Sequence, residues 1–156
     1  MKIDLLLIIS ILLFGCNHPQ KDKKEKLTKI LETKQVLNDV VSLSVLPNIF
    51  VLSQLPDMVE VKMINNTNDT ITTGLYYKIE RNENDKWKEV SPKDIVFQDL
   101  GWQLRPSHTE NFEKNLYKDK INYKVGKYRI AKYYLKADYQ KTKENYTIYA
   151  EFNIVK

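Results

Sequence analysis

The sequence is poor in the residues that most often build covalent and metal sites. Its 156 residues include one cysteine, two histidines, four glycines and five prolines. A single cysteine excludes an intrachain disulfide and a thiolate metal site, so a folded domain must rely on its hydrophobic core. His18 and His108 have no partner at ligand spacing, so we expect no metal and no cofactor. The low glycine and proline content excludes collagen-like and low-complexity chains.

Motifs of catalysis are also missing. The sequence has no Gly-x-Ser-x-Gly elbow and no phosphate-binding loop. Ser107 and His108 are adjacent in sequence, but triad partners meet in space, so a polar turn is the better interpretation. Asp94 and Asp99 could act as paired carboxylates, although we expect Asp99 to bond backbone amides. The sequence therefore predicts that the protein is not an enzyme, with a small hydrolase as the least favoured alternative.

The charge distribution does not indicate nucleic acid as a partner. Lysine and arginine number 25 against 20 acidic residues, which gives a formal net charge of +5. The lysines are spread along the chain rather than gathered in one stripe with interleaved aromatics, and no nucleic-acid motif is present. We expect a lysine-rich, solvated surface that lies near anionic lipid or cell-wall polymer.

The N-terminus has the pattern of an export signal. Lys2 precedes the apolar run 5–14, which is too short to span a membrane and has the length of a signal core. Leu13-Phe14-Gly15-Cys16 resembles the bacterial lipobox. The resemblance implies cleavage before Cys16 and lipid on that cysteine, so that the protein is exported and anchored to the cell membrane or outer membrane. An ordinary secretory signal or a short hydrophobic helix is the alternative.

These observations divide the chain into three parts. Residues 1–15 are the predicted lipoprotein signal peptide, and residues 16–38 are the lipidated cysteine with a polar tether that could contain a short helix. Residues 39–156 are the predicted folded domain, which is long enough to bury a core of its own.

From Val41 onward the hydrophobic period becomes two, which is typical of half-buried strands. Asn and Asp clusters at 65–69 and 82–85 predict turns, and the second turn predicts a hairpin. The region 91–107 is punctuated by proline and glycine and is predicted to be irregular. Seven to eight short strands favour an all-β, immunoglobulin-like antiparallel sandwich, with a small barrel as the alternative. The predicted strands lie near 41–45, 59–63, 75–79, 87–90, 112–116, 126–135 and 146–154.

Tyr128 supports the sandwich. It follows a glycine turn at the start of a long predicted strand, where such folds place a tyrosine whose hydroxyl bonds backbone upstream. Ile130 stands two residues later, where antibody domains have a cysteine. The predicted core is therefore held without a disulfide at this position.

Five segments in order resemble a family of bacterial immunoglobulin-like domains found in exported proteins and lipoproteins. They are residues 59–67, 74–80, 86–90, 97–106 and 126–132. Ser107 stands where the family pattern has glycine, and Lys114 interrupts an apolar alternation. The resemblance implies the architecture and export of the domain, and it assigns no catalytic or binding residue.

The sequence therefore predicts a non-catalytic interaction module at the cell envelope. Outward tyrosines at Tyr76 and Tyr149, together with Trp102, form the candidate binding surface. The partners would be the membrane, through lipid on Cys16, and an envelope protein or a cell-wall polymer. The alternative is a lipoprotein that binds a polysaccharide or small ligand with the aromatics and lysines around 97–102.

Overall fold

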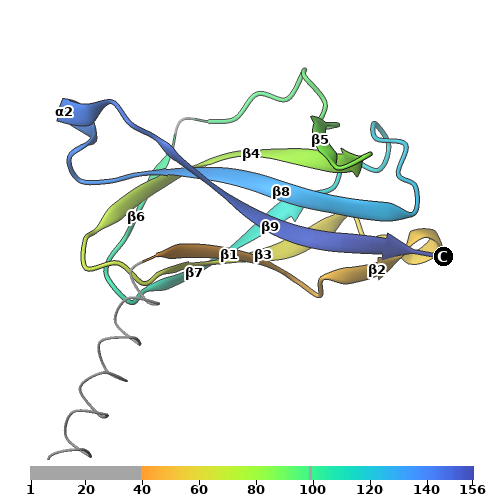
Figure 1. Cartoon of the computed structure of the whole chain (residues 1–156), viewed down its shortest axis with the longest axis horizontal. Coiled ribbons are helices and arrows are strands. Elements are labelled where there is room, and N and C mark those ends of the chain that lie inside the picture. The colour runs from red at the N-terminus through yellow and green to blue at the C-terminus, as the bar shows by residue number, and fades with distance from the viewer. Residues whose placement is uncertain (1–39, 99) are drawn as a thin grey trace, which may run out of the picture. The chain divides into compact units, whose positions relative to one another are not determined.

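A computed structural model describes residues 40–98 and 100–156, which form two β-sheets (Figure 1). The smaller sheet has the order β1 (Val41–Leu46), β3 (Met58–Asn65) and β7 (Thr109–Asn115). The larger sheet has the order β2 (Ile49–Val51), β9 (Tyr146–Val155), β8 (Gly126–Leu135), β4 (Ile71–Glu83) and β5 (Lys86–Glu89), and β6 (Gly101–Leu104) pairs with β4. The predicted all-β sandwich is confirmed.

Short elements and one parallel pair complete the described chain. A 3₁₀ turn, η1 (Leu52–Gln54), follows β2, and the short helix α2 (Tyr139–Thr142) lies between β8 and β9. The chain passes from the smaller to the larger sheet between β1 and β2, across the cis peptide bond that precedes Pro47. β2 then runs parallel to β9, while the other pairs in the described residues are antiparallel.

The described residues contain nine strands, where the sequence predicted seven to eight. β6 lies inside the region that was predicted to be irregular, because its four residues are too few to show an alternation between flanking glycine and proline signals. β4 begins at Ile71, earlier than predicted, because Ile71 and Thr73 face the core while Gly74 interrupts the apolar pattern.

The predicted turns are confirmed and have clear chemical causes. Asn84 and Asp85 have φ values of 53° and 60°, which a two-residue hairpin turn between β4 and β5 requires. Asn65 is fully buried at the other turn, and its Nδ2 donates to the carbonyl oxygens of Asp69 (2.8 Å) and Leu104 (2.9 Å). Its Oδ1 accepts the Thr67 amide at 3.0 Å, so one amide side chain orders the whole turn.

Tyr128 forms the predicted corner. It is 1% exposed, its hydroxyl donates to the Lys124 carbonyl, and it accepts the Lys124 amide, both at 3.0 Å. Its ring stacks on Phe152 with centroids 5.6 Å apart. Ile130, two residues later, is completely buried. The corner therefore fixes the start of β8 against the core without a disulfide.

Two lysines lie inside the sandwich, between two apolar clusters. Lys114 of β7 and Lys132 of β8 are 3% and 1% exposed. The Phe112 ring centroid lies 5.1 Å from the Lys114 Nζ and 4.6 Å from the Lys132 Nζ. Burial lowers the pKa of Lys114 to about 8. Burial, together with the smaller effect of the Lys114 charge, lowers the pKa of Lys132 to about 7.

The two amines bind an irregularity in β4. The β4–β8 register shifts between Thr73 and Tyr77. Over this step the chain moves four residues along β4 but only two along β8, so β4 contains a bulge. Within this bulge the Gly74 carbonyl accepts a hydrogen bond from Lys132, and the Leu75 carbonyl accepts one from Lys114 at 3.2 Å. The lysines therefore satisfy backbone oxygens that the shifted register leaves inside the core. At the end of the bulge, Tyr76 lies on the outside of the sheet, and Tyr77, where regular pairing resumes, lies on the inside.

Candidate binding face

The outer surface of the larger sheet carries aromatic and charged side chains at its centre. Alternation along β4 buries Tyr77 and Ile79 and turns Tyr76, Lys78 and Glu80 outward. The register places Lys78, Ala131 and Tyr149 side by side across three strands. We call this surface the outer face; it consists of Tyr76, Lys78, Glu80, Arg129, Ala131, Tyr133, Thr147 and Tyr149.

A hollow of about 310 Å³ lies over Ala131. Ala131 carries only a methyl group, whereas its neighbours across the strands are the long side chains of Lys78 and Tyr149. The small residue therefore forms a floor and its neighbours form the walls. The hollow is lined by Tyr76, Lys78, Glu80, Ala131, Lys132, Tyr133, Asn145, Thr147 and Tyr149.

Arg129 holds one wall of this hollow in place. Its guanidinium carbon lies 3.7 Å from the ring centroid of Tyr149 and 4.2 Å from that of Trp87. Its Nε donates to the Glu80 carboxylate at 2.5 Å, and both partners are less than one-fifth exposed. Although Tyr149 is 44% exposed, the cation–π contact with Arg129 holds its ring in place.

Tyr76 is ordered from two sides although it is 39% exposed. Its ring makes an edge-to-face contact with Phe97 at 5.3 Å and a tilted contact with Tyr133 at 6.1 Å. Gly74 permits the approach of Tyr133, because a Cβ at position 74 would lie 3.1 Å from the Tyr133 hydroxyl oxygen. The glycine and the bulge therefore place two tyrosines together on the outer face.

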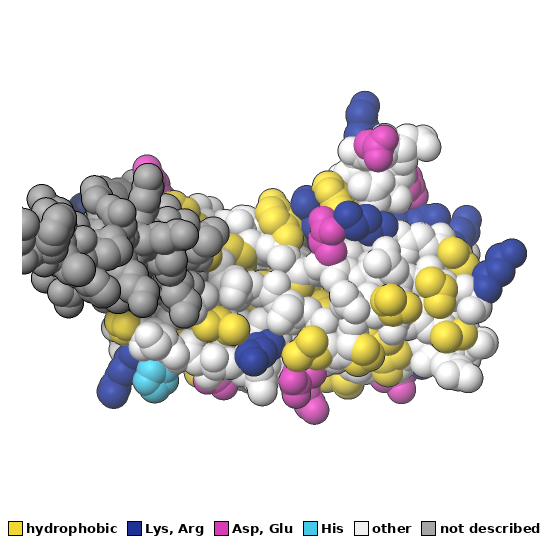
Figure 2. Space-filling model, turned by 60° about the horizontal axis from the view of Figure 1, so that its bottom comes forward, with side chains coloured by type: hydrophobic (Ala, Val, Ile, Leu, Met, Phe, Trp, Pro, Cys, Tyr) yellow, Lys and Arg dark blue, Asp and Glu magenta, His cyan; other side chains and the backbone are white. Residues whose placement is uncertain are grey.

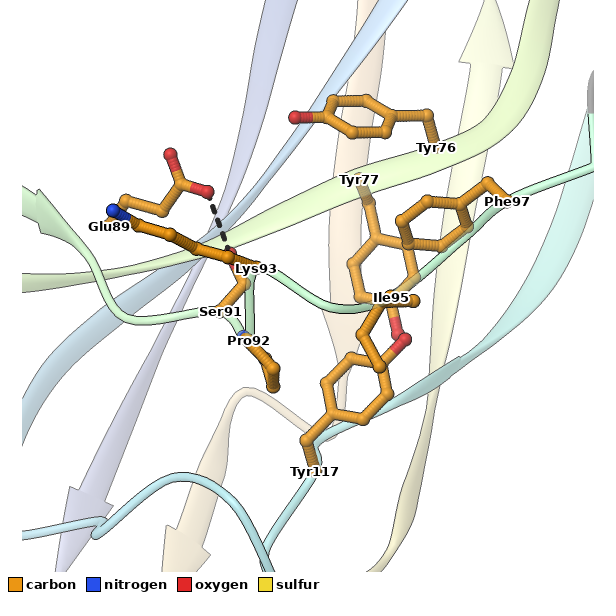
Figure 3. A pocket seen from close by; sticks show the side chains of 9 residues that line it. All are labelled: Tyr76, Tyr77, Glu89, Ser91, Pro92, Lys93, Ile95, Phe97 and Tyr117. Atoms are coloured by element: carbon orange, nitrogen blue, oxygen red, sulfur yellow. Dashed lines mark hydrogen bonds between the residues drawn. The ribbon is translucent and has the colours of Figure 1, made fainter.

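A second hollow, of about 260 Å³, lies on the other side of Tyr76 (Figure 3). Figure 3 shows Tyr76 and Phe97 above the rings of Tyr77 and Tyr117, which stack at 6.1 Å. The Tyr77 hydroxyl donates to the Asn115 carbonyl at 2.8 Å, and burial raises its pKa far above neutrality. Tyr77 therefore acts as a fixed inner wall, and Tyr76 separates the two hollows.

Trp102, the third predicted surface residue, lies elsewhere. It is paired with Thr73 in the β4–β6 ladder and packs edge-to-face on Phe112 at 6.1 Å. Its side chain is half-buried against the apolar cluster that contains Met63 and Leu104. The structure therefore brings Tyr76 and Tyr149 to one face and turns Trp102 toward the core.

The sequence alone did not identify Ala131 or Arg129 as parts of this face, or Trp87 as the second ring that contacts Arg129. Alternation along β8 places Arg129 and Ala131 outward, and that signal is present in the sequence. Their importance depends on the cross-strand register, which puts Ala131 between Lys78 and Tyr149. A single sequence does not specify that register.

The side chains considered for catalysis are dispersed within the described residues. The Asp94 carboxylate accepts a hydrogen bond from Lys120 at 2.7 Å, and this bond lowers its pKa. Ser107 and His108 are exposed in a turn, where the Ser107 amide donates to the Asn65 carbonyl. No group of three or more His, Cys, Asp or Glu side chains in the described ranges could hold a metal ion. Asp99 and the predicted lipidation site at Cys16 lie outside those ranges.

A separate apolar patch lies at the end of the domain that carries β2 and η1 (Figure 2). Its exposed side chains include Leu46, Ile49, Val51, Leu52 and Val155, and the register joins Val51 to Val155. In contrast to the outer face, it is formed by aliphatic side chains.

Among the helices of the described residues, none has the length and apolarity needed to cross a membrane.

The comparisons with known proteins agree with this architecture. A family profile described as "Bacterial Ig-like domain" matches residues 41–153, which covers every described strand except the last residues of β9. A search of curated proteins finds no match to the chain.

Proposed function

The chain belongs to the bacterial Ig-like domain family, and we propose that it is a lipid-anchored envelope protein whose domain binds a partner through the outer face. Domains of this family are generally non-enzymatic binding or structural modules of exported or surface proteins. The anchor would be lipid on Cys16, and the binding surface would be the outer face around Tyr76 and Tyr149.

The anchor is supported by the sequence before the domain. The apolar run 5–14 followed by Gly15 and Cys16 has the order of a lipoprotein signal. Acyl chains on Cys16 would each contribute about 0.8 kcal/mol per buried methylene, so two or more chains hold a domain stably. The charged segment after Cys16 would then keep the domain away from the bilayer.

The binding face is supported by one observation, that Tyr76 and Tyr149 are exposed and at the same time packed against neighbouring side chains. Aromatic side chains that are already immobilised lose little conformational entropy when a partner covers them. Tyrosine is also among the residues that most often dominate binding energy. The contacts of Arg129 with Tyr149, and of Phe97 with Tyr76, supply this order before any partner arrives.

Photo-crosslinking in living cells tests the binding face. A photoreactive amino acid at Tyr76 or Tyr149 should give adducts with an envelope component, whether protein or polymer. The same probe at Trp102, which faces the core, or at Tyr139 on α2 is the control and should give no comparable adduct. Equal adducts from all four positions, or none from the outer face, would contradict the proposal.

A labelling experiment tests the anchor independently. Cells fed an alkyne-tagged fatty acid should label the wild-type chain, and Cys16→Ser should abolish the label and release the protein from membranes. Ser10→Ala, within the apolar run, is a control that keeps the cysteine and should retain the label. An unlabelled wild-type chain that fractionates as a free secreted protein would refute the anchor.

A further inference from the structure

We propose that the hollow over Ala131 binds an uncharged sugar ring, presented as part of an envelope polysaccharide. This inference rests on the proposed binding function of the outer face and names the chemistry of its ligand. It follows from the shape of the hollow, the pairing of its charges, and the alternation of aromatic and polar groups around it.

The shape suits a single ring with short substituents. The hollow, at about 310 Å³, lies at the lower limit of the range typical for small-molecule sites. Its floor is the Ala131 methyl group, and the rings of Tyr76, Tyr133 and Tyr149 form walls. Aromatic faces carry partial negative charge, so they attract the C–H groups that a sugar ring presents on its own faces.

The charges around the hollow are already paired within the protein. The Lys78 ammonium donates to Glu89 at 2.8 Å, and Arg129 donates to Glu80 at 2.5 Å. An anionic ligand would have to compete with Glu89 for Lys78, and a cationic ligand would have to compete with Arg129 for Glu80. A neutral ligand needs to break neither pair, and this favours neutral over charged sugars.

An apolar occupant is also disfavoured. An aliphatic side chain over Ala131 would remove water from Lys78 and Glu80 without replacing its hydrogen bonds, which is unfavourable. Sugar hydroxyls both donate and accept, so they can replace that water at the ammonium and at the carboxylate. Asn145 and Thr147 line the same hollow and add amide and hydroxyl groups at its rim.

The shallow, open form of the site predicts weak binding to one ring and stronger binding to a polymer. A single ring makes few contacts, so we expect a Kd of about 1 mM. Many domains on one membrane, facing a repeating polymer, gain avidity through effective concentration. The proposal therefore expects oligosaccharides to bind better than the matching monosaccharide.

The chain offers a built-in reporter because it has three alanines, Ala131, Ala137 and Ala150. Ala131 is the floor of the hollow, Ala137 is exposed in the turn before α2, and Ala150 is buried in the core. The full lipidated chain in nanodiscs, labelled at alanine methyl groups, is titrated with neutral trisaccharides of glucose, galactose and N-acetylglucosamine. A uronic-acid trisaccharide is the charged comparison.

The expected result is a saturable shift of the Ala131 methyl signal with at least one neutral trisaccharide, while Ala137 and Ala150 stay unchanged. Tyr149→Ala should weaken this binding at least about tenfold, which corresponds to 1.4 kcal/mol, whereas Tyr139→Ala on α2 should not. Ala131→Ile, which fills the hollow, should abolish trisaccharide binding, seen as the loss of ligand-induced shifts of the tyrosine ring signals around the hollow. Ala137→Ile should leave those shifts intact.

Two results would overturn the sugar inference. The first is preferential binding of the uronic-acid trisaccharide, and the second is no Ala131 shift with any neutral trisaccharide at about 10 mM. If the latter occurs while probes at Tyr76 and Tyr149 still crosslink an envelope protein, the binding module stands and only its ligand class is wrong. Absence of both signals would remove the proposed function as well.

Discussion

Replacing Lys132 by methionine is expected to raise the free energy of unfolding at neutral pH. Lys132 is 1% exposed, and it has the Lys114 amine rather than a carboxylate as its charged neighbour. Methionine keeps a flexible side chain of similar length and removes the charge. The substitution therefore isolates the cost of placing an ammonium group between two apolar clusters.

The magnitude follows from the pKa. A fall from 10.5 to about 7 corresponds to about 4 to 5 kcal/mol of unfavourable free energy for the charged form in the folded state. The variant also loses the hydrogen bond to the Gly74 carbonyl, and an unsatisfied buried carbonyl costs about 1 to 3 kcal/mol. The expected net gain at pH 7 is therefore about 2 kcal/mol.

The pH dependence gives the sharper test. Because the pKa of Lys132 is lowered on folding, this site binds more protons in the unfolded chain between pH 7 and 10.5, and the contribution of Lys132 to wild-type stability rises across this range. The advantage of Lys132→Met should be greatest at or below pH 7 and should vanish or reverse near pH 10.5. Urea unfolding at pH 6, 7, 9 and 10.5 measures this difference. Titrating groups that do not interact with Lys132 cancel in it, whereas Lys114, whose charge does interact, contributes to the same pH window.

Lys127→Met is the matched control, because Lys127 lies on the same strand but pairs with Glu151 at the surface. It should change stability by less than about 1 kcal/mol at every pH. A Lys132→Met variant that is less stable than the wild type at pH 7 would refute the reasoning. So would a stability difference that does not change with pH.

Three further substitutions probe the turns and the corner. Tyr128→Phe removes both bonds to Lys124 and should destabilise the domain by about 1 to 3 kcal/mol in urea unfolding, while a neutral effect would show that the corner contributes little. Ser107→Gly should stabilise it by up to about 1 kcal/mol in thermal unfolding, because Ser107 has a φ of 61°; a lower melting temperature would contradict this. Asn65→Ala should cost at least about 2 kcal/mol, and an unchanged denaturation midpoint would show that the turn is ordered by its backbone alone.

The strands with long, regular alternation could be predicted from the sequence. In β9, Ala150, Phe152 and Ile154 are buried as predicted. Successive side chains of a strand point to opposite faces of the sheet, so an alternating apolar set can be buried only by facing the core. The corner at Tyr128 was also predictable, since its glycine and tyrosine lie close together in the chain. A local sequence pattern is therefore enough to predict a feature whose residues are neighbours in the chain.

The bulge in β4 could not be predicted, because its cause is not local. The carbonyls of Gly74 and Leu75, within the shifted register, accept hydrogen bonds from Lys132 and Lys114, which are distant in sequence. Lys114 interrupts the apolar pattern in the sequence, but its side chain takes the inward position that the pattern predicts for an apolar residue. Hydropathy places lysine at the surface. The sequence therefore gives no sign that Lys114 and Lys132 are buried or that β4 has a bulge.

The candidate face was predictable in part. Alternation placed Tyr76 and Tyr149 outside, and the structure puts both on the same sheet. Trp102 looked equivalent in the sequence, but its ladder with Thr73 turns it toward Phe112. Their role in binding stays a prediction until the crosslinking and titration experiments are done.

The position of Lys114 has a consequence for aggregation. β7 is one of the two edge strands of the smaller sheet among the described residues, and β1 is the other. An edge strand is a template on which a second molecule can add a strand. An inward-pointing charge opposes such addition, because a docked strand would cover the edge and leave the ammonium still further from water. Copies held by the anchor proposed for Cys16 would often meet edge to edge on a crowded membrane, and Lys114 would help to keep them separate.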